Sequence, residues 1–235
     1  MPSNIVILTG AGISAESGLP TFRDAKGLWE GHRPEQVATP EAFARDPALV
    51  HRFYNMRRAA LDTVQPNAAH EALALLHRRF DGEVVLVTQN VDDLHERGGS
   101  EDVIHMHGEL RKIRCARCDD VRLWRGDLST ATVCAACGKL GGLRPDIVWF
   151  GEMPFYMDEI QHSLEHTDLF VAIGTSGVVY PAAGFVRVAM AHGAATIEIN
   201  AVGTEVSDQF GRHMIGPATQ QVPLLVEEIL SGRKV

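Results

Sequence analysis

Four short apolar runs, each closed by a glycine or a polar residue, constrain the fold of this 235-residue chain more than any other feature. They are Ile5 to Leu8, Glu83 to Thr88, Leu169 to Gly174 and Thr196 to Asn200. Their β-branched residues follow one another with little polar alternation, which predicts strands buried on both faces. Strands of this kind form a parallel sheet, and ligands bind outside the carboxyl ends of such strands.

Helical periodicity fills the intervals between the runs, so we expect helices to cover both faces of an open α/β sheet through right-handed crossovers. The predicted helices span Pro47 to Val64, Ala68 to Arg79, Met157 to His166, Ala182 to His192 and Val222 to Leu230. Two other segments, which form the insertion and the module given in the next sentence, are too long to be simple crossovers between strands. The expected organisation is one sheet domain (residues 1–30, 80–110 and 144–235), a helical insertion (31–79) and a small metal-binding module (111–143).

Charge and hydrophobicity exclude several classes of protein. Acidic residues outnumber basic residues by 30 to 22, and the resulting net charge of −8 repels a nucleic-acid backbone. Each apolar stretch falls far short of the roughly 20 residues that span a bilayer. The amino terminus lacks the features of a secretory signal. We therefore expect a cytoplasmic, monomeric protein without nucleic-acid or membrane partners.

All four cysteines lie in two Cys-x-x-Cys pairs, Cys115 with Cys118 and Cys134 with Cys137. Two such pairs at this separation can present four thiolates in the tetrahedral arrangement that Zn²⁺ prefers. Four thiolates leave no open coordination position, which predicts a structural zinc ion in a module poor in apolar residues. The alternative is a set of reduced cysteines that only pack. The arginines of the module are interspersed with acids and form no continuous basic stripe, which argues against nucleic-acid binding.

A glycine turn, Gly10-Ala11-Gly12-Ile13-Ser14, follows the first predicted strand. Its glycines let the main chain approach a pyrophosphate, and a helix that begins here would direct N–H groups at it. The next glycine, Gly18, does not fit the G-x-G-x-x-G spacing of dehydrogenases, so a turn that only shapes the strand exit is an alternative. Gly174-Thr175-Ser176 and Asn200 close two further strands and would add hydroxyl and amide groups for phosphate and ribose at the same edge.

Polar residues also close the second strand, as Thr88-Gln89-Asn90-Val91-Asp92, and His105 and His107 follow. An amide and a carboxylate at a strand edge can together recognise a carboxamide. The two histidines alternate, so in an extended segment their side chains point to opposite sides and one of them can enter a ligand site. Taken alone, a histidine in such a protein is more often a hydrogen-bonded structural residue.

These motifs resemble those of the sirtuin family, the NAD-dependent protein lysine deacylases, and in particular of its bacterial members in the desuccinylating class. The resemblance extends over nearly the whole chain and implies a Rossmann-type large domain, a small zinc-binding domain, and a site between them where NAD and an acylated lysine meet. It is carried by the four cysteines and by Gly10 to Asp24, Thr88 to Gly99, His105 to Leu110, Arg144 to Glu152, Gly174 to Ser176 and Glu198 to Asn200.

The resemblance also implies roles for individual residues. His107 would be the general base, and Ala15 to Trp29 would form a mobile loop over the cofactor. The residues that would bind NAD are Gly10, Ala11, Gly12, Ser14, Ala15, Phe22, Arg23, Trp29, Gln89, Asn90, Val91, Asp92, Gly174, Thr175, Ser176, Asn200, Ala201 and Ala218. The residues that would bind the acyl-lysine peptide, as a strand added between residues 150–152 and 177–180, are Ala38, Tyr54, Arg57, Phe150, Gly151, Glu152 and Val178.

The implied reaction consumes NAD as a co-substrate. Loss of nicotinamide exposes C1′ of the ribose to attack by the carbonyl oxygen of the acyl-lysine, which gives an alkylimidate. His107, with an unperturbed pKa of about 6.5, would then accept a ribose hydroxyl proton so that the 2′-oxygen attacks the imidate carbon. The expected products are free lysine, nicotinamide and an O-acyl-ADP-ribose.

Tyr54 and Arg57 lie three positions apart and share one face of a predicted helix, where a phenol and a guanidinium can bind the same carboxylate. Without the resemblance, an ordinary solvated helix face is the simpler interpretation, because Arg52 and Arg58 lie close by. Desuccinylating sirtuins carry this Tyr-x-x-Arg pair in the acyl pocket, and Ala38 matches a small pocket residue. The pair therefore predicts a preference for succinyl-lysine, with malonyl-lysine and acetyl-lysine as further substrates.

Two other functions are alternatives. Mono-ADP-ribosyl transfer would use the same NAD site and deliver the sugar to a protein nucleophile, but it has no evident use for Tyr54 and Arg57. A zinc-ribbon binding module that holds NAD only as a structural or sensing ligand would need no base at His107.

Overall fold

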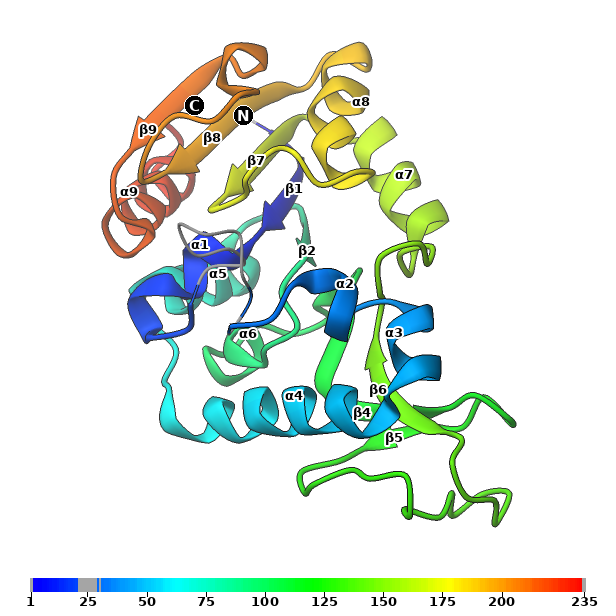
Figure 1. Cartoon of the computed structure of the whole chain (residues 1–235). Helices are drawn as coiled ribbons and strands as arrows, with labels where there is room; N and C mark the ends of the chain where they lie inside the picture. The colour runs from blue at the N-terminus through cyan, green and yellow to red at the C-terminus, as the bar shows by residue number, and fades with distance from the viewer. Residues whose placement is uncertain (1, 21–28, 30, 234–235) are drawn as a thin grey trace.

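The computed structural model describes residues 2–20, 29 and 31–233. Within these residues, six parallel strands form a sheet in the order β3-β2-β1-β7-β8-β9, and three antiparallel strands form a smaller sheet in the order β5-β4-β6 (Figure 1). The large sheet contains β1 (Asn4–Thr9), β2 (Glu83–Thr88), β3 (Ile104–His105), β7 (Leu169–Ile173), β8 (Ala195–Asn200) and β9 (Arg212–Ile215). The small sheet contains β4 (Gly108–Cys115), β5 (Val121–Leu123) and β6 (Leu143–Ile147).

Proline and short polar caps start several of the helices. Asp46 accepts a hydrogen bond from the Leu49 amide at the start of α4, and Asn67 accepts one from the Ala69 amide at the start of α5. In the described part of the chain, no helix is both long and apolar enough to cross a membrane. The helices are α1 (Ala11–Ser14), α2 (Pro34–Val37), α3 (Pro40–Arg45), α4 (Pro47–Ala60), α5 (Ala68–Arg79), α6 (Leu94–Arg97), α7 (Met157–Glu165), α8 (Phe185–Ala191) and α9 (Ala218–Leu230).

The expected α/β fold with its parallel sheet is confirmed, and the four predicted strands are present as β1, β2, β7 and β8. Strand β9 was not predicted, because its first residues, Arg212 and His213, are polar and it lies at the sheet edge. Helix α9 begins at Ala218 rather than Val222, since Thr219 is held by two hydrogen bonds to the Glu16 carboxylate. The helix predicted over residues 47–64 ends at Ala60 and continues as a 3-10 turn.

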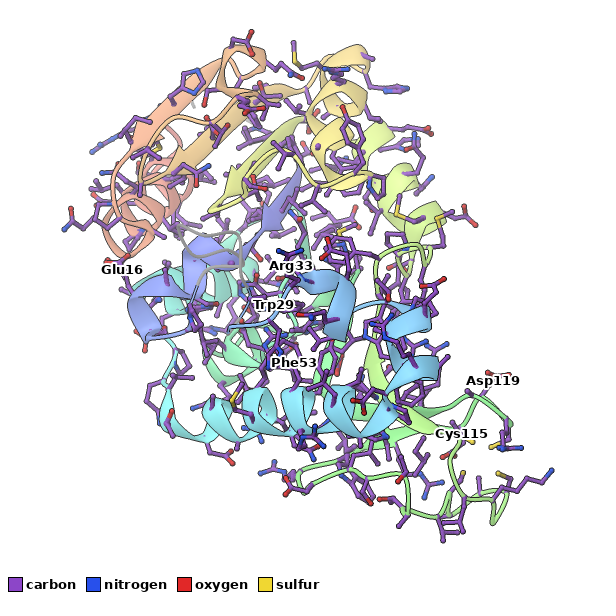
Figure 2. The ribbon with its side chains drawn as sticks, in the orientation of Figure 1. Glu16, Trp29, Arg33, Phe53, Cys115 and Asp119 are labelled. Atoms are coloured by element: carbon purple, nitrogen blue, oxygen red, sulfur yellow. The ribbon has the colours of Figure 1, made fainter. Side chains whose placement is uncertain are left out.

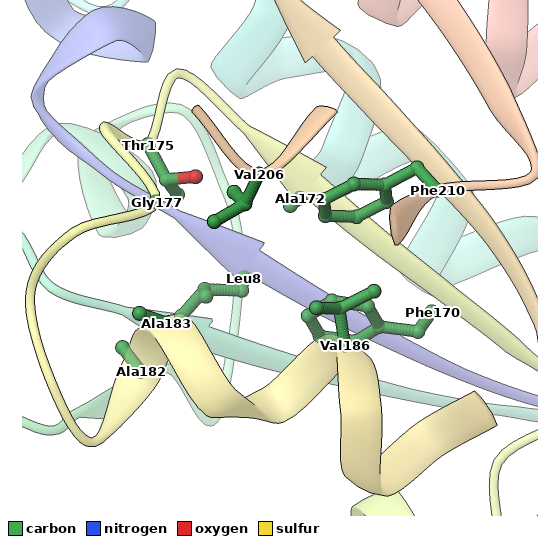
Figure 3. Close-up of a pocket in the computed structure, with 10 residues that line it drawn as sticks. All are labelled: Leu8, Phe170, Ala172, Thr175, Gly177, Ala182, Ala183, Val186, Val206 and Phe210. Carbon is green, nitrogen blue, oxygen red and sulfur yellow. The ribbon is translucent and has the colours of Figure 1, made fainter. Parts of the chain in front are cut away.

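Successive strand residues face two separate cores. Ile5 and Ile7 of β1 pack with α5 and α9 on one face of the sheet, whereas Val6 and Leu8 pack with α7 and α8 on the other. This double burial accounts for the apolar runs in the sequence. A cavity of about 10 Å³ remains between the sheet and α8, beside Leu8 and Val186 (Figure 3). It has room for at most one water molecule and is not a ligand site.

Helix α4 joins the helical insertion to the small sheet. Phe53 and Tyr54 lie in an apolar core with Leu110 of β4 and Ile147 of β6. Arg58, which is buried, donates from Nε to the carbonyl of Leu110 at 2.7 Å. Of the expected module boundaries, residue 111 lies inside β4 and residue 143 is the first residue of β6. The division of the chain into three units stays a prediction.

The carboxyl ends of β1 and β7 meet at a close contact between two glycines. The Gly12 amide donates to the Gly174 carbonyl at 2.9 Å, and a Cβ on Gly12 would lie 2.6 Å from the Gly174 Cα. Gly174 itself has φ +62°, a conformation that favours glycine. Helix α1 therefore begins directly against the end of the neighbouring strand, and any side chain here would separate the two.

We predict that Gly12→Ala destabilises the protein, although alanine normally favours a helix. The added methyl group meets main-chain atoms of Gly174 that cannot move without separating β1 from β7. Overpacking of this kind costs about 1–3 kcal/mol, which lowers the melting temperature by several degrees. Thermal unfolding followed by circular dichroism measures the change.

Gly126→Ala is the matched control, because among the described residues no atom lies within 4 Å of the added Cβ and Gly126 is not in the left-handed region. Its melting temperature should match that of the wild type. Equal melting temperatures for both variants would contradict the proposed contact.

Candidate active site

Candidate ligand-binding residues gather at the carboxyl edge of the large sheet. Residues Gly10 to Ser14 follow β1, and residues Gln89 to Asp92 follow β2, which pairs with β1 in parallel register up to Thr9 and Thr88. Gly174 to Ser176 follow β7, and Asn200 and Ala201 end and follow β8. The parallel order of these four strands brings segments that are up to 190 residues apart to one edge.

Ser14 and Asn90 connect the ends of β1 and β2. The Asn90 side-chain amide donates to the Gly10 carbonyl and to Ser14 Oγ, both at 3.2 Å. Ser14 Oγ donates in turn to Asp92 Oδ2 at 3.1 Å, and the Leu94 amide donates to Asp92 Oδ1. All three side chains are buried. The amide and carboxylate expected to recognise a carboxamide are therefore fixed in one hydrogen-bonded group.

Burial raises the pKa of Asp92, while its hydrogen bonds from Leu94 and Ser14 act in the opposite direction. Its carboxylate is therefore more easily protonated than that of an exposed aspartate. A ligand group that donates hydrogen bonds would compensate for this burial. The nicotinamide carboxamide is a donor of this kind.

His107 has the tautomer and the charge state that its predicted role as a base requires. Its Nδ1 lies 3.1 Å from the Gln89 carbonyl oxygen, and because a carbonyl can only accept, Nδ1 carries the proton. In the neutral ring the lone pair is then on Nε2. Burial lowers the pKa of His107, and the Gln89 carbonyl partly offsets this effect. The ring is therefore neutral at pH 7, as a general base requires.

His105 has a different role. Its Nε2 lies 2.6 Å from Glu96 Oε1, and its Nδ1 lies 3.2 Å from the Asn90 carbonyl. Burial lowers the pKa of His105, but Glu96 and the other partners outweigh it and raise the pKa above the usual value. With both nitrogens hydrogen-bonded, His105 supports the Asn90 segment, and the expectation that only one of the two histidines is chemical stays a prediction.

Two buried histidines behind this group were not predicted. His95 Nε2 lies 2.9 Å from Thr9 Oγ1, and His70 Nε2 lies 3.4 Å from Ser14 Oγ. Burial lowers the pKa of His70 to about 4 and that of His95 well below its usual value, so both rings are neutral. A signal was present for His70: Asn67-x-x-His70 is a capping pair at the start of α5.

The residues expected on the ribose side lie just after β7, at the end of β8 and at the start of α9. Thr175 and Ala218 are buried, and Ser176 and Ala201 are exposed. The Asn200 side-chain amide donates to the Thr175 carbonyl at 2.9 Å, which joins the ends of β7 and β8. These residues border the same sheet edge as the glycine turn, and their contacts with a nucleotide stay a prediction.

The predicted cofactor loop is described only in part. Phe22 and Arg23 lie outside the described residues, and Ala15 is exposed. Trp29 is buried against Phe53, with ring centres 5.2 Å apart (Figure 2). The Arg57 guanidinium carbon lies 4.2 Å from the centre of the Trp29 ring. The contacts of Trp29 thus lie with the expected acyl-binding residues, while its role toward NAD stays a prediction.

Tyr54 and Arg57 lie one turn apart on α4 and face the core of the insertion. Tyr54 is 1% exposed, and its hydroxyl accepts a hydrogen bond from Trp149 Nε1 at 3.0 Å. Burial raises the pKa of Tyr54 to about 12, against the opposing effect of Arg57. The phenol is therefore protonated at neutral pH and can donate one hydrogen bond to a ligand. Ala38 is buried in the same core.

The expected peptide-binding segment is held by an internal ion pair. Arg144 donates to both Glu152 oxygens at 2.5 and 2.8 Å, and the Trp149 amide donates to Glu152 Oε2 at 2.8 Å. The Phe150 amide donates to the Ala38 carbonyl. Because the Glu152 carboxylate is used within the protein, we expect a peptide to meet the main chain of this segment rather than this side chain. Val178, in the second segment expected to border the peptide, is exposed.

The four cysteines lie together at the end of the small module, in which Figure 2 labels Cys115. Their Sγ atoms all lie within 4.8 Å of one another, with 3.9 Å between Cys115 and Cys137 and 3.8 Å between Cys118 and Cys134. Tetrahedral zinc with a Zn–S bond of about 2.3 Å requires about 3.8 Å between sulfurs. These distances fit a metal site and are too long for a disulfide.

Fold and site together define a class: an α/β protein with a dinucleotide-type glycine turn, a half-buried neutral histidine at the sheet edge and a four-cysteine module. The model of the "Sir2 family" matches residues 10–181. A Bdellovibrio bacteriovorus protein named NAD-dependent protein deacylase is 57% identical over 229 residues, which is 97% of each chain.

Solved structures of Sir2 proteins are similar to this chain over most of their length. A Sir2 homologue in complex with NAD has a TM-score of 0.89 at 42% identity and covers 98% of this chain and 91% of its own. A Sir2 protein bound to a myristoylated histone peptide has a TM-score of 0.75 at 33% identity and covers 97% and 91%. The chain belongs to the Sir2 family, the sirtuins.

We predict that the purified protein contains one Zn²⁺ per chain and that Cys118→Ser lowers both the metal content and the melting temperature, because the ion would join the two Cys-x-x-Cys turns. Elemental analysis and thermal unfolding measure the two effects. Thr130→Ala, at an exposed position of the same module, is the control and should change neither. A chelated, metal-free protein that melts like the wild type would argue against a structural ion.

Proposed function

We propose that this chain removes acyl groups from lysine side chains of proteins while consuming NAD, with a preference for carboxylated acyl groups such as succinyl and malonyl and with acetyl as a further substrate. NAD-dependent deacylation is supported by membership of the Sir2 family and by the names of its relatives. The products are free lysine, nicotinamide and an O-acyl-ADP-ribose. The four cysteines would hold Zn²⁺, which would stabilise the small module and take no part in the reaction.

The observation that carries the proposal is the orientation of His107. The Gln89 carbonyl fixes the proton on Nδ1, and Gln89 directly precedes Asn90, whose side chain binds Gly10 and Ser14. One segment thus holds the His107 ring and also carries Asn90, which we expect to bind the nicotinamide ribose, and this supports a role for the Nε2 lone pair at that sugar. There it would accept a ribose hydroxyl proton, so that the sugar oxygen attacks the acyl carbon.

The acyl preference rests on Arg57 and Tyr54. Both groups can donate hydrogen bonds to a ligand, and the surrounding core of Ala38, Phe53 and Trp149 is apolar. A carboxylate that enters this region would receive charge-assisted hydrogen bonds, each with a net contribution of about 1.5–3 kcal/mol. An acetyl group is too short and too apolar to use them, so it would bind without this contribution.

We predict that kcat/KM falls at low pH with the pKa of His107. Only the neutral ring accepts a proton, and burial lowers this pKa, so activity is full at neutral pH and is lost as the pH drops through a value below the usual 6.5 of histidine. His107→Ala should lower kcat/KM by about 10²–10⁴-fold. His192→Ala, at an exposed surface position, should leave the profile unchanged. An acid limb at or above 6.5 would contradict the assignment.

We predict that Arg57→Met lowers kcat/KM for a succinyl-lysine peptide by about ten- to a hundredfold, while the matched acetyl-lysine peptide loses much less, because only the succinyl group presents a carboxylate to Arg57. Arg57 is a cleaner test than Tyr54, whose hydroxyl also accepts the Trp149 hydrogen bond. Steady-state kinetics with both peptides measure the ratio.

Arg52→Met on the exposed face of the same helix is the control and should leave the ratio unchanged. Equal losses on both peptides in Arg57→Met would refute the carboxylate role. Mass spectrometry of the same reactions tests the reaction type: nicotinamide and O-acyl-ADP-ribose should form in step with free lysine. ADP-ribose attached to the protein would instead favour transfer.

A further inference from the structure

Glu198 of β8 is a buried carboxylate that the reaction does not use. It is 1% exposed and binds groups from three segments. Its Oε1 accepts from Thr204 Oγ1 at 2.7 Å and from the Asn200 side-chain amide at 3.2 Å. Its Oε2 accepts from Ser207 Oγ and lies 3.3 Å from His213 Nδ1 on β9. One carboxylate therefore organises the end of β8 and the chain that connects it to β9.

The contact with Asn200 fixes the orientation of that amide. One N–H bond of Asn200 Nδ2 points to the Thr175 carbonyl and the other to the Glu198 carboxylate. A flipped amide would place its oxygen against these two acceptors, which is unfavourable. Both donors are thus used within the protein, and Asn200 presents Oδ1, an acceptor, to a ligand.

We infer that Glu198 is a positioning residue that makes this end of the site select a dinucleotide with a free adenine-ribose hydroxyl over one with a 2′-phosphate. The inference rests on the proposed function and on the resemblance to the sirtuins, which implies that Asn200 binds the adenine ribose. A ribose hydroxyl can donate to Oδ1, whereas a phosphate offers acceptors only and is repelled by the nearby carboxylate.

The surrounding charges agree with this selection. Burial raises the pKa of Glu198, but hydrogen bonds from Ser207, Thr204, Asn200 and His213 outweigh it and lower the pKa, so the group is ionised. An arginine near the ribose is the usual means of accepting a 2′-phosphate. Arg212, next to His213 on β9, is bound through both terminal nitrogens to Glu228 at 2.7 and 3.1 Å. It is therefore already neutralised by a partner.

Calorimetric titration of NAD and NADP into the full-length protein tests the inference. The wild type should bind NADP at least about tenfold more weakly than NAD. Glu198→Gln keeps the shape of the side chain but removes its charge and lets the Asn200 amide reorient. The ratio of the NADP Kd to the NAD Kd should therefore fall by at least about threefold. Thr204→Val removes one hydrogen bond to Glu198 but keeps the charge and the Asn200 contact, and its ratio should equal that of the wild type.

A purely structural role would weaken both dinucleotides alike, so an unchanged ratio in Glu198→Gln overturns the inference, as does equal binding of both by the wild type. Should Glu198→Gln fail to fold, Asn200→Ala provides the test. It removes the acceptor Oδ1, so the ratio of the NADP Kd to the NAD Kd must also fall. Deacylation of a succinyl peptide by the wild type is measured separately. Its absence would refute the proposed function without changing the measured ratio.

Discussion

Main-chain contact between Gly12 and Gly174 brings the ends of β1 and β7 so close that no side chain fits between them. Two further strand ends are joined to this contact through side chains. Asn90 binds the Gly10 carbonyl from the β2 side, and Asn200 binds the Thr175 carbonyl from the β8 side. The sheet edge is thus a continuous hydrogen-bonded structure, in which two asparagine amides and two glycines set the spacing of the groups that would meet a dinucleotide.

Burial determines the charge of the histidines around this edge. Desolvation lowers the pKa values of His70, His95 and His107, so these rings are neutral, and Glu96 makes His105 the exception. A neutral His107 accepts a proton, and neutral His70 and His95 add no positive charge near the place where a cationic nicotinamide would bind. The same desolvation would therefore also prepare His107 for its proposed role as the base.

Local patterns in the sequence predicted the strands that are buried on both faces, such as β1 and β7. An apolar run can be recognised in the sequence without knowing which residues it will contact. The cysteine spacing predicted a metal site for the same reason. The contacts between distant residues could not be predicted in this way. Tyr54 accepts a hydrogen bond from Trp149, 95 residues away, and Trp29 packs on Phe53. Strand β9 and the Glu198 contacts depend on polar residues whose partners are fixed by the topology.

Helix α4 shows how the small module and the expected acyl site depend on each other. Tyr54 points to Trp149, in the segment that follows β6, while the next residue, Asn55, exchanges two hydrogen bonds of 2.9 Å with the main chain of Leu128 in the module. One turn later, Arg58 binds the carbonyls of Leu110 and Gly126. A change in the module therefore shifts the same helix turn that carries Arg57, so a metal ion with no part in the chemistry would still control the geometry of acyl recognition.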